Sequence, residues 1–179
     1  MTFSNILERI VRMPSKMWQT IVQHVTDPSA LMMYSHIPFV GRFATIRLWK
    51  YHAEITAENM HDEAQEYADI IEQLTLSDER VWKEIWKIQF PQLKHLRLRD
   101  VKRFPPYMRL SRKLEILEFD NCRIRLHSKQ VKTSGWLSEK VFTPSLRTFR
   151  VTPQRNFTTE ESAFLYRRCP DTRLLLNGH

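Results

Sequence analysis

The chain has 179 residues, of which 42% are hydrophobic and 27% charged, and this composition supports packed cores and excludes a wholly disordered chain. No apolar run approaches the roughly 18 residues that a membrane span needs, and a total of three glycines excludes a glycine-rich phosphate-binding loop. Residues 1–90 carry 9 Lys/Arg against 12 Asp/Glu, a net charge of −3, whereas residues 91–179 carry 19 against 8, a net charge of +11. We therefore expect two parts with different surfaces, of which the second attracts acidic partners.

Short helices separated by prolines are expected in residues 1–52. Pro14 suits the first turn of a helix, because its missing N–H leaves no helical hydrogen bond unmade there. Asp27 and Pro28 are typical of the N-cap and first position of a second helix. Pro38 then interrupts before a third apolar run. Helices of this length can share one core.

Residues 53–76 are predicted to form a helical linker. The segment is rich in Ala, Glu and Asp and contains neither Gly nor Pro. Its apolar residues recur at helical intervals. These residues are Ile55, Met60, Ala64, Tyr67, Ile70, Ile71 and Leu74. His52 and His61 lie beside acidic residues, but without an HExxH pattern a solvated acidic helix face is favoured over a metal site.

An apolar template at offsets 0, +3 and +5 recurs in residues 77–179. It begins at Leu93, Leu114 and Leu146, and a degraded copy begins at Asp171, so the starts lie 21, 32 and 25 residues apart. Such a unit cannot bury its apolar face alone, and stacked neighbours build a continuous core. The spacing resembles that of leucine-rich repeats, with an insertion after the second copy. We predict about four irregular repeats that contribute short parallel strands.

Side chains alternate between the two faces of a strand, which divides the template residues into two groups. The residues expected to point inward are Leu96, Leu98, Leu117, Phe119, Phe149, Val151, Leu174 and Leu176. The candidate target-binding residues of the opposite face are Arg97, Arg99, Glu118, Arg150 and Arg173. Guanidinium groups match carboxylates and phosphates in geometry. The alternative is a ladder of opposite charges across Arg97, Glu118 and Arg150, worth ~0.2–1 kcal/mol per pair.

A series of short motifs lies in order along residues 13–52. The series is Met13-Pro14, Ile21-Val22, Val25, Asp27-Pro28, Leu31, Phe39-Val40-Gly41-Arg42-Phe43 and Leu48-Trp49-Lys50. This series resembles the F-box, whose pattern opens with Leu-Pro, continues through an Ile-Leu pair and an Asp-Pro turn, and ends with Leu-Trp. The chain departs from that pattern at Met13, at Lys16, where Glu is common, and at Phe43, which stands for Trp.

The resemblance implies an F-box protein with leucine-rich repeats, that is, a helical module followed by a short α/β repeat array with parallel strands. Such a protein is the substrate-recognition subunit of an SCF-type cullin–RING ubiquitin ligase. It docks a Skp-type adaptor through the F-box and an acidic or phosphorylated target protein through the repeats. The implied adaptor-binding residues are Met13, Pro14, Met17, Ile21, Val22, Val25 and Leu31.

Three alternatives to this interpretation remain open at this stage. In the first, the chain is an F-box subunit that binds the adaptor but works outside degradation. In the second, the apolar helical residues pack on the rest of the chain, as such stripes normally do. In the third, the basic half belongs to a repeat scaffold or a nucleic-acid-binding protein.

No catalytic pattern emerges from the sequence, so we predict neither an enzyme nor a metal or cofactor site. Cys122 and Cys169 are interpreted as structural thiols, because free cysteines are among the most buried residues. Two cysteines form no disulfide framework, which favours a reducing compartment, the cytoplasm or the nucleus.

Overall fold

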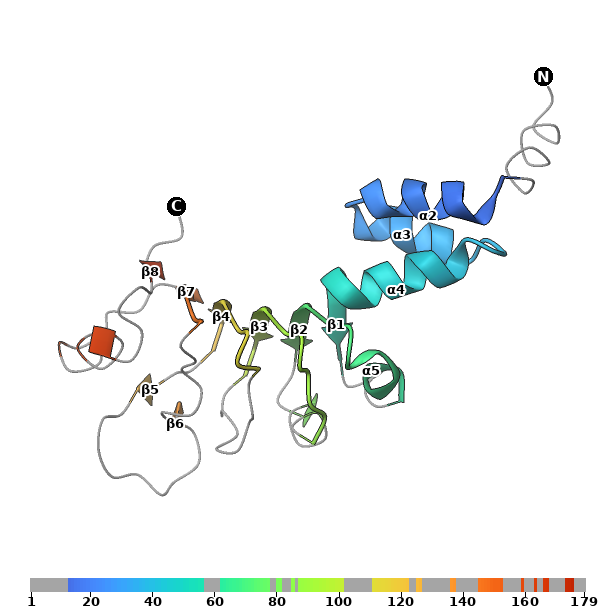
Figure 1. Cartoon of the computed structure of the whole chain (residues 1–179). Helices are drawn as coiled ribbons and strands as arrows, with labels where there is room; N and C mark the ends of the chain where they lie inside the picture. Colours follow the sequence, from blue (N-terminus) through green and yellow to red (C-terminus); the bar gives the residue numbers. More distant parts are fainter. Residues whose placement is uncertain are drawn as a thin grey trace. The chain divides into compact units, whose positions relative to one another are not determined.

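The computed structural model divides into two compact units, Met1–His52 and Ala53–His179 (Figure 1). It describes residues 13–56, 62–77, 80–81, 85, 87–101, 111–122, 125–126, 136–137, 145–152, 159, 163, 166–167 and 173–175. The fold is α+β, with helices in the first unit and a parallel sheet in the second. Among the described residues, no helix combines the length and the apolar character that crossing a membrane requires.

The described part of the first unit contains helices α2 (Ser15–His24), α3 (Pro28–Ser35) and α4 (Gly41–His52). Pro14 directly precedes α2. Asp27 caps α3, since its carboxylate accepts hydrogen bonds from the N–H groups of Ser29 at 3.1 Å and Ala30 at 3.2 Å. The proline boundaries and the cap are confirmed.

The helical unit has a core of its own. Its buried residues are Trp18, Val22, Leu31, Val40 and Ala44. Gly41 begins α4 at a close approach to α3, because a Cβ atom there would lie 2.3 Å from the carbonyl oxygen of Ser35. Arg47 also ties two helices together, since its Nε donates to the carbonyl oxygen of Val25 at 2.8 Å.

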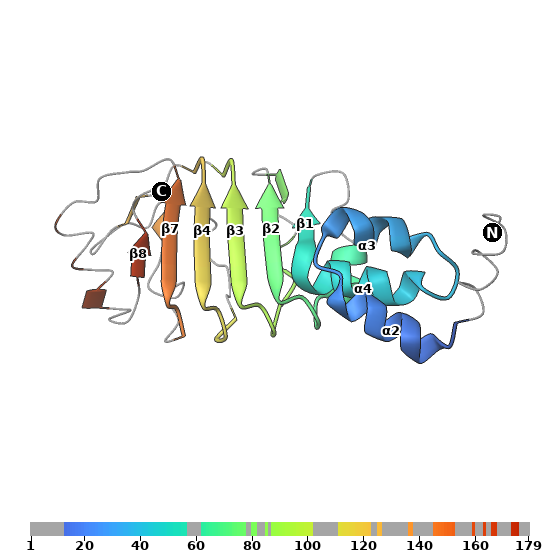
Figure 2. The ribbon, with the colours of Figure 1, turned by 90° about the horizontal axis from the view of Figure 1, so that it is seen from above.

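The second unit is built on a six-stranded sheet in which every pairing is parallel (Figure 2). The strands of this sheet lie side by side in the order in which they occur along the chain. Its strands are β1 (Ala53–Ile55), β2 (Gln73–Ser77), β3 (His95–Arg99), β4 (Ile116–Asp120), β7 (Thr148–Thr152) and β8 (Arg173–Leu175). Between β4 and β7 the chain forms a separate parallel pair, β5 (Arg125–Leu126) and β6 (Trp136–Leu137). This pair occupies the long interval where the sequence predicts an insertion.

The register of the sheet follows the apolar template. Leu96 pairs with Leu117, and Leu117 with Phe149, so residues at the same offset meet in neighbouring strands. The inward residues of β3, β4 and β7 are buried, as predicted. Phe119 and Phe149 pack with ring centroids 5.5 Å apart. Phe149 also pairs with Leu174 in register, but the side chains of Leu174 and Leu176 lie outside the described residues.

The segment 53–76 is not the helical linker that the sequence predicts. In the described residues of this segment only α5 (Asp62–Tyr67) is helical, and β1 and β2 belong to the sheet. Leu74 and Leu76 are buried and pair with Leu96 and Leu98. Together with Ile71 they form a further copy of the 0/+3/+5 template, so the sheet unit begins at residue 53 and not at 77.

Strands β3 and β4 end in equivalent turns. Asp100 and Asn121 follow them with φ angles of 57° and 52°, and Asp and Asn tolerate this left-handed region. The N–H of Asp100 donates to the carbonyl oxygen of Asp120 at 2.9 Å, and the N–H of Asn121 donates to that of Thr152 at 2.6 Å. The side-chain amide of Asn121 also donates to the carboxylate of Asp100. One turn thus supports the next across the sheet.

Candidate functional site

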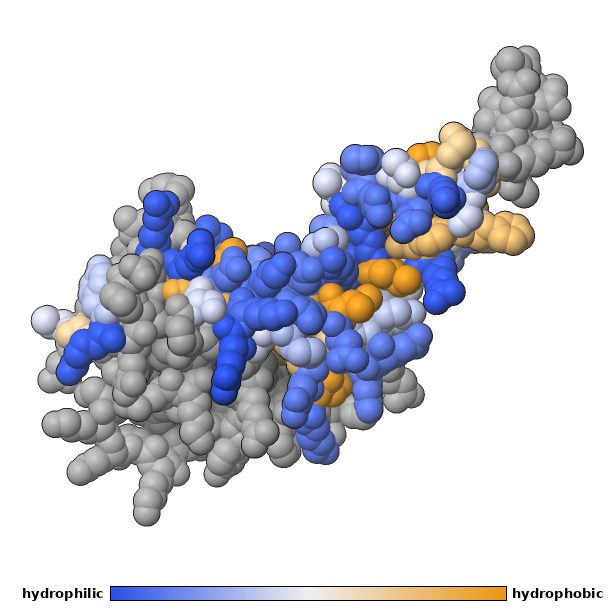
Figure 3. All heavy atoms as spheres, in the orientation of Figure 1, coloured by the Kyte–Doolittle hydropathy of each residue, from blue (hydrophilic) through white to orange (hydrophobic). Residues whose placement is uncertain are grey.

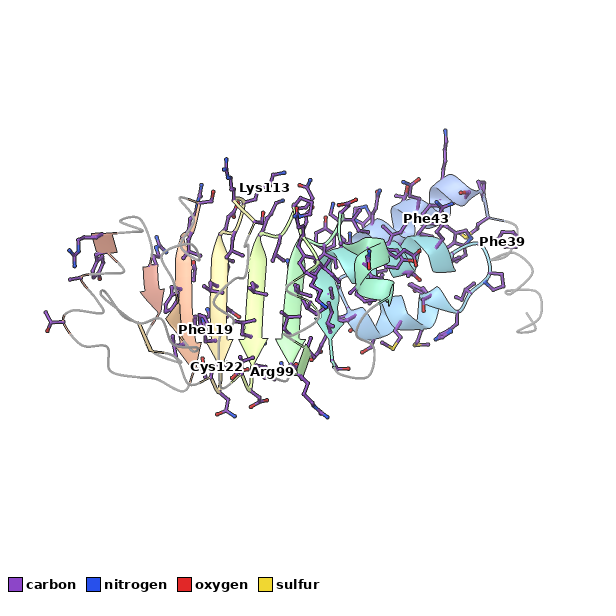
Figure 4. All side chains as sticks on the ribbon, turned by 90° about the horizontal axis from the view of Figure 1, so that it is seen from below. Phe39, Phe43, Arg99, Lys113, Phe119 and Cys122 are labelled. Carbon is purple, nitrogen blue, oxygen red and sulfur yellow. The ribbon has the colours of Figure 1, made fainter. Side chains whose placement is uncertain are left out.

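One face of the sheet carries a charged row. We use this name for Glu54, His95, Arg97, Arg99, Glu118, Asp120 and Arg150. They alternate along β1, β3, β4 and β7 with the buried template residues, which gives the predicted separation of faces. Figure 4 shows Arg99 and Cys122 at the carboxyl ends of the strands and Lys113 at the opposite ends.

Glu118 is the centre of the charged row. Its Oε1 lies 2.9 Å from an Nη of Arg150, and its Oε2 lies 3.4 Å from Nε2 of His95 and 4.0 Å from Nε of Arg97. The side chain of Glu118 is only 12% exposed. The interaction with His95, followed by the charges of Arg150 and Arg97, lowers the pKa of Glu118, and these causes outweigh burial, which acts in the opposite direction.

Asp120 and Glu54 extend the row toward β1. Asp120 Oδ2 lies 2.7 Å from an Nη of Arg97 and 3.6 Å from Nε of Arg99. Arg99 also reaches Glu54 across β2, with 3.3 Å between its Nη and Oε1 of Glu54. The charge ladder that the sequence left open as an alternative is therefore present. A target anion would compete with these carboxylates for Arg97 and Arg99.

Arg173 lies apart from these ion pairs. It is exposed, begins β8, and pairs in register with Thr148. Its N–H donates to the carbonyl oxygen of Arg147 at 2.7 Å. Of the predicted target-binding residues, Arg97, Arg99, Glu118 and Arg150 lie together in the charged row.

The predicted adaptor-binding residues fall into three groups in the helical unit. Val22 and Leu31 are 2% and 0% exposed and belong to the core of the unit, so a partner cannot contact their side chains directly. Their assignment as contact residues is corrected on this ground. Three others, Met13, Ile21 and Val25, are partly buried against the same core. The remaining two, Pro14 and Met17, are exposed.

The helical unit exposes five large hydrophobic side chains, of which the sequence nominated only Met17. We call the five large exposed hydrophobics of this unit the exposed apolar set. They are Met17, Met32, Met33, Phe39 and Ile46. Among the described residues of the whole chain, the sixth such residue is Tyr166. Figure 3 shows apolar colours on the surface of the helical unit. Five of the six large exposed hydrophobics among the described residues thus lie between residues 17 and 46.

A sequence signal for part of this set does exist. Leu31, Met32 and Met33 are consecutive in a helix of eight residues, and successive helical residues lie about 100° apart around the axis. Three consecutive apolar residues therefore cannot share one narrow face. Since Leu31 enters the core, the two methionines turn outward.

Cys122 has the contacts of a structural thiol. Its Sγ lies 3.3 Å from the carbonyl oxygen of Leu98 and 3.2 Å from that of Asp120, and the N–H of Val101 donates to it at 3.4 Å. Burial raises the pKa of Cys122, against the hydrogen bond from Val101, so the thiol stays protonated near neutral pH. Cys169 lies outside the described residues.

In the described part of the chain, no three His, Cys, Asp or Glu side chains gather closely enough to hold a metal ion. His61 lies outside the described residues. Comparisons with models of protein families, with curated proteins and with solved structures found no match to this chain.

Proposed function

We propose that this chain is the substrate-recognition subunit of an SCF-type cullin–RING ubiquitin ligase. The observation that carries the proposal is the exposed apolar set, because the helical unit presents these side chains although it already has its own core. The resemblance of residues 13–52 to an F-box names the partner as a Skp-type adaptor. The strand order and template register support an array of leucine-rich repeats in the second unit.

The proposed mechanism is proximity. The helical unit docks the adaptor while the sheet unit holds a target protein near the ubiquitin donor. Tethering raises the effective concentration of the target lysine and needs no catalytic group in this chain.

The burial pattern revises the contact residues within this proposal. The adaptor contacts Pro14, Met17 and the rest of the exposed apolar set, and the edges of the partly buried Met13, Ile21 and Val25. Val22 and Leu31 hold the helices that present these residues.

The target-binding face in this proposal is the charged row together with Arg173. Arg150 and Arg97 carry exposed fractions of 47% and 41%, so both guanidinium groups can reach a bound carboxylate or phosphate. Their ion pairs with Glu118 and Asp120 make the row selective, because only an anion that replaces those carboxylates gains from binding.

The adaptor is tested with the full chain and a purified Skp-type adaptor by titration calorimetry. Binding of the unmodified chain is expected. Met33 is 71% exposed, so in this proposal the adaptor covers its side chain. Met33→Glu is expected to weaken binding at least tenfold, because the contact would then bury an unpaired charge. Gln23→Glu is the matched control, since it adds the same charge at an exposed position of α2. Absence of binding by the unmodified chain would refute the proposal.

A basic repeat protein that binds nucleic acid is the second candidate, favoured by the net charge of +11 over residues 91–179 and by the exposed Arg112, Lys113 and Arg147. It predicts affinity for nucleic acid that falls steeply with salt and is lost when Arg97, Arg99 and Arg150 are replaced together. Nucleic-acid affinity that is absent, or that does not respond to salt, would eliminate the second.

A further inference from the structure

The connection between α3 and α4 contains a turn with an unexpected residue at its tip. Ile37, Pro38, Phe39 and Val40 form the turn, closed by a hydrogen bond from the N–H of Val40 to the carbonyl oxygen of Ile37 at 3.2 Å. Phe39 follows the proline with a φ of 68°. Proline followed by a positive φ is the arrangement of a type II turn, whose third position is normally glycine.

Phe39 is unfavourable here for two independent reasons. A left-handed backbone brings the Cβ atom of any L-residue against the following carbonyl, and a bulky ring has no local hydrogen bond to offset this. The side chain is also 79% exposed, the highest value of the exposed apolar set. Figure 4 shows it on the connection at the end of the helices, whereas Phe43 lies among them.

A bulky apolar residue at a positive φ sets Phe39 apart from the other such positions of the described chain. The other non-glycine residues with positive φ in the described part of the chain are Asp100 and Asn121, types that tolerate the left-handed region. Gly41, two residues after Phe39, stands where a Cβ atom would collide with Ser35. Strain retained at an exposed residue points to a function that selects the side chain.

The turn holds Phe39 rigidly. Val40 is 1% exposed and belongs to the core of the helical unit. The carbonyl oxygen of Ile37 also accepts the N–H of Gly41 at 2.8 Å, and the N–H of Ile37 donates to the carbonyl oxygen of Tyr34 at 3.0 Å. A side chain presented from a backbone fixed in this way adds no loss of backbone freedom on binding, which favours an anchor residue.

We propose that Phe39 is the anchor of the docking surface and inserts into an apolar pocket of the adaptor; this inference rests on the proposed function. The positive charge around Phe39 indicates which charge the edge of the adaptor pocket should carry. Residues 13–52 carry four Lys/Arg and one Asp, and Arg42 is exposed three residues after Phe39. The adaptor surface that receives the ring is therefore acidic at its edge.

The test compares Phe39→Gly, Phe39→Ala and the unmodified chain, each full length, in calorimetry with a Skp-type adaptor and in thermal unfolding. Phe39→Gly is expected to raise the unfolding temperature of the helical unit, because glycine relieves the positive φ, and to weaken adaptor binding at least tenfold. Phe39→Ala is expected to weaken binding equally with a smaller thermal effect, since alanine keeps the backbone strain. Tyr166→Ala removes an exposed aromatic ring of the other unit and is expected to leave both measurements unchanged.

The outcomes separate this inference from the proposed function. If the unmodified chain binds the adaptor and Phe39→Gly binds it with the same affinity, Phe39 is not the anchor and the proposed function still stands. A lower unfolding temperature in Phe39→Gly would contradict the strain assigned to Phe39. Arg42→Glu is expected to weaken binding at least threefold, and an unchanged affinity would contradict the acidic rim. No binding by the unmodified chain would refute the proposed function, and the anchor with it.

Discussion

Replacement of Glu118 by glutamine is the sharpest test of the charged row, because it removes one charge and almost no volume. The carboxylate contacts Arg150 at 2.9 Å, His95 at 3.4 Å and Arg97 at 4.0 Å. Glutamine keeps an acceptor oxygen for Arg150 but leaves three cationic or ionisable groups on one sheet face without their central anion.

The expected loss in the free energy of unfolding is about 1–2 kcal/mol. A hydrogen bond to a charged group contributes about 1.5–3 kcal/mol when buried, and Glu118 is 12% exposed. The side chains of Arg97 and Arg150 are 41% and 47% exposed, so solvent screens part of the attraction and the lower end applies. Glu66→Gln on α5 is the matched control, and a change within about 0.5 kcal/mol is expected at that exposed position.

The pH dependence gives a second measure of the same interaction. Because the pKa of Glu118 is lowered in the folded chain, its stabilising contribution is fully present above its ordinary value of 4.5 and is lost as the pH falls through the lower folded value. The stability difference between the unmodified chain and Glu118→Gln is therefore expected to be largest near neutral pH and to shrink in acid. Amide hydrogen exchange of β3, β4 and β7 in the full chain measures it at each pH.

Two results would refute this account of Glu118. The first is a Glu118→Gln chain as stable as the unmodified one at neutral pH. The second is a stability difference that stays constant from neutral pH to below 4.5, which would mean that the ionised carboxylate of Glu118 is not what stabilises the sheet.

Three further substitutions test the packing of the two units. Gly41→Ala is expected to destabilise the helical unit by about 1–3 kcal/mol, because the added methyl lies 2.3 Å from the carbonyl oxygen of Ser35; unchanged hydrogen exchange in α3 and α4 would contradict this. Phe119→Ala is expected to cost about 3–5 kcal/mol in urea unfolding, since it leaves a cavity beside Phe149, and a loss below 1 kcal/mol would show that the core can collapse around it. Asp27→Ala is expected to cost about 1 kcal/mol by removing two cap hydrogen bonds from α3, and an unaltered thermal unfolding curve by circular dichroism would speak against the cap.

The sheet was accessible to sequence reasoning where the template was intact. Leu93, Leu114 and Leu146 start copies whose strands lie in register, so a count of offsets was enough to predict the pairings. The copy that begins at Ile71 was missed, because Tyr67, Ile70, Ile71 and Leu74 also satisfy a helical period. Over a few residues, the two periodicities cannot be told apart.

Burial in the helical unit was harder to predict, because periodicity finds an apolar stripe without saying what covers it. Val22 and Leu31 lie on such stripes and fill the core of the unit itself. Phe39 lies on no stripe, and its exposure follows from a turn geometry that sequence rules reserve for glycine. Phe39 departs from the turn rule that expects glycine, so that rule could not predict the turn from the sequence.

The two units differ in the chemistry that they present, and the proposed function gives them different partners on this ground. In the described residues of the sheet unit, the exposed row is charged and the single large exposed hydrophobic is Tyr166. The helical unit has five such residues and one carboxylate among residues 13–52, which is already used to cap α3. A lasting subunit contact depends on apolar burial around a rigid anchor, whereas selection among targets depends on charges that reject a mismatched partner. Within the proposed function, the helical unit therefore suits the adaptor and the sheet suits the target. An exchange of these proposed roles would require apolar surface on the charged row that its residues do not supply.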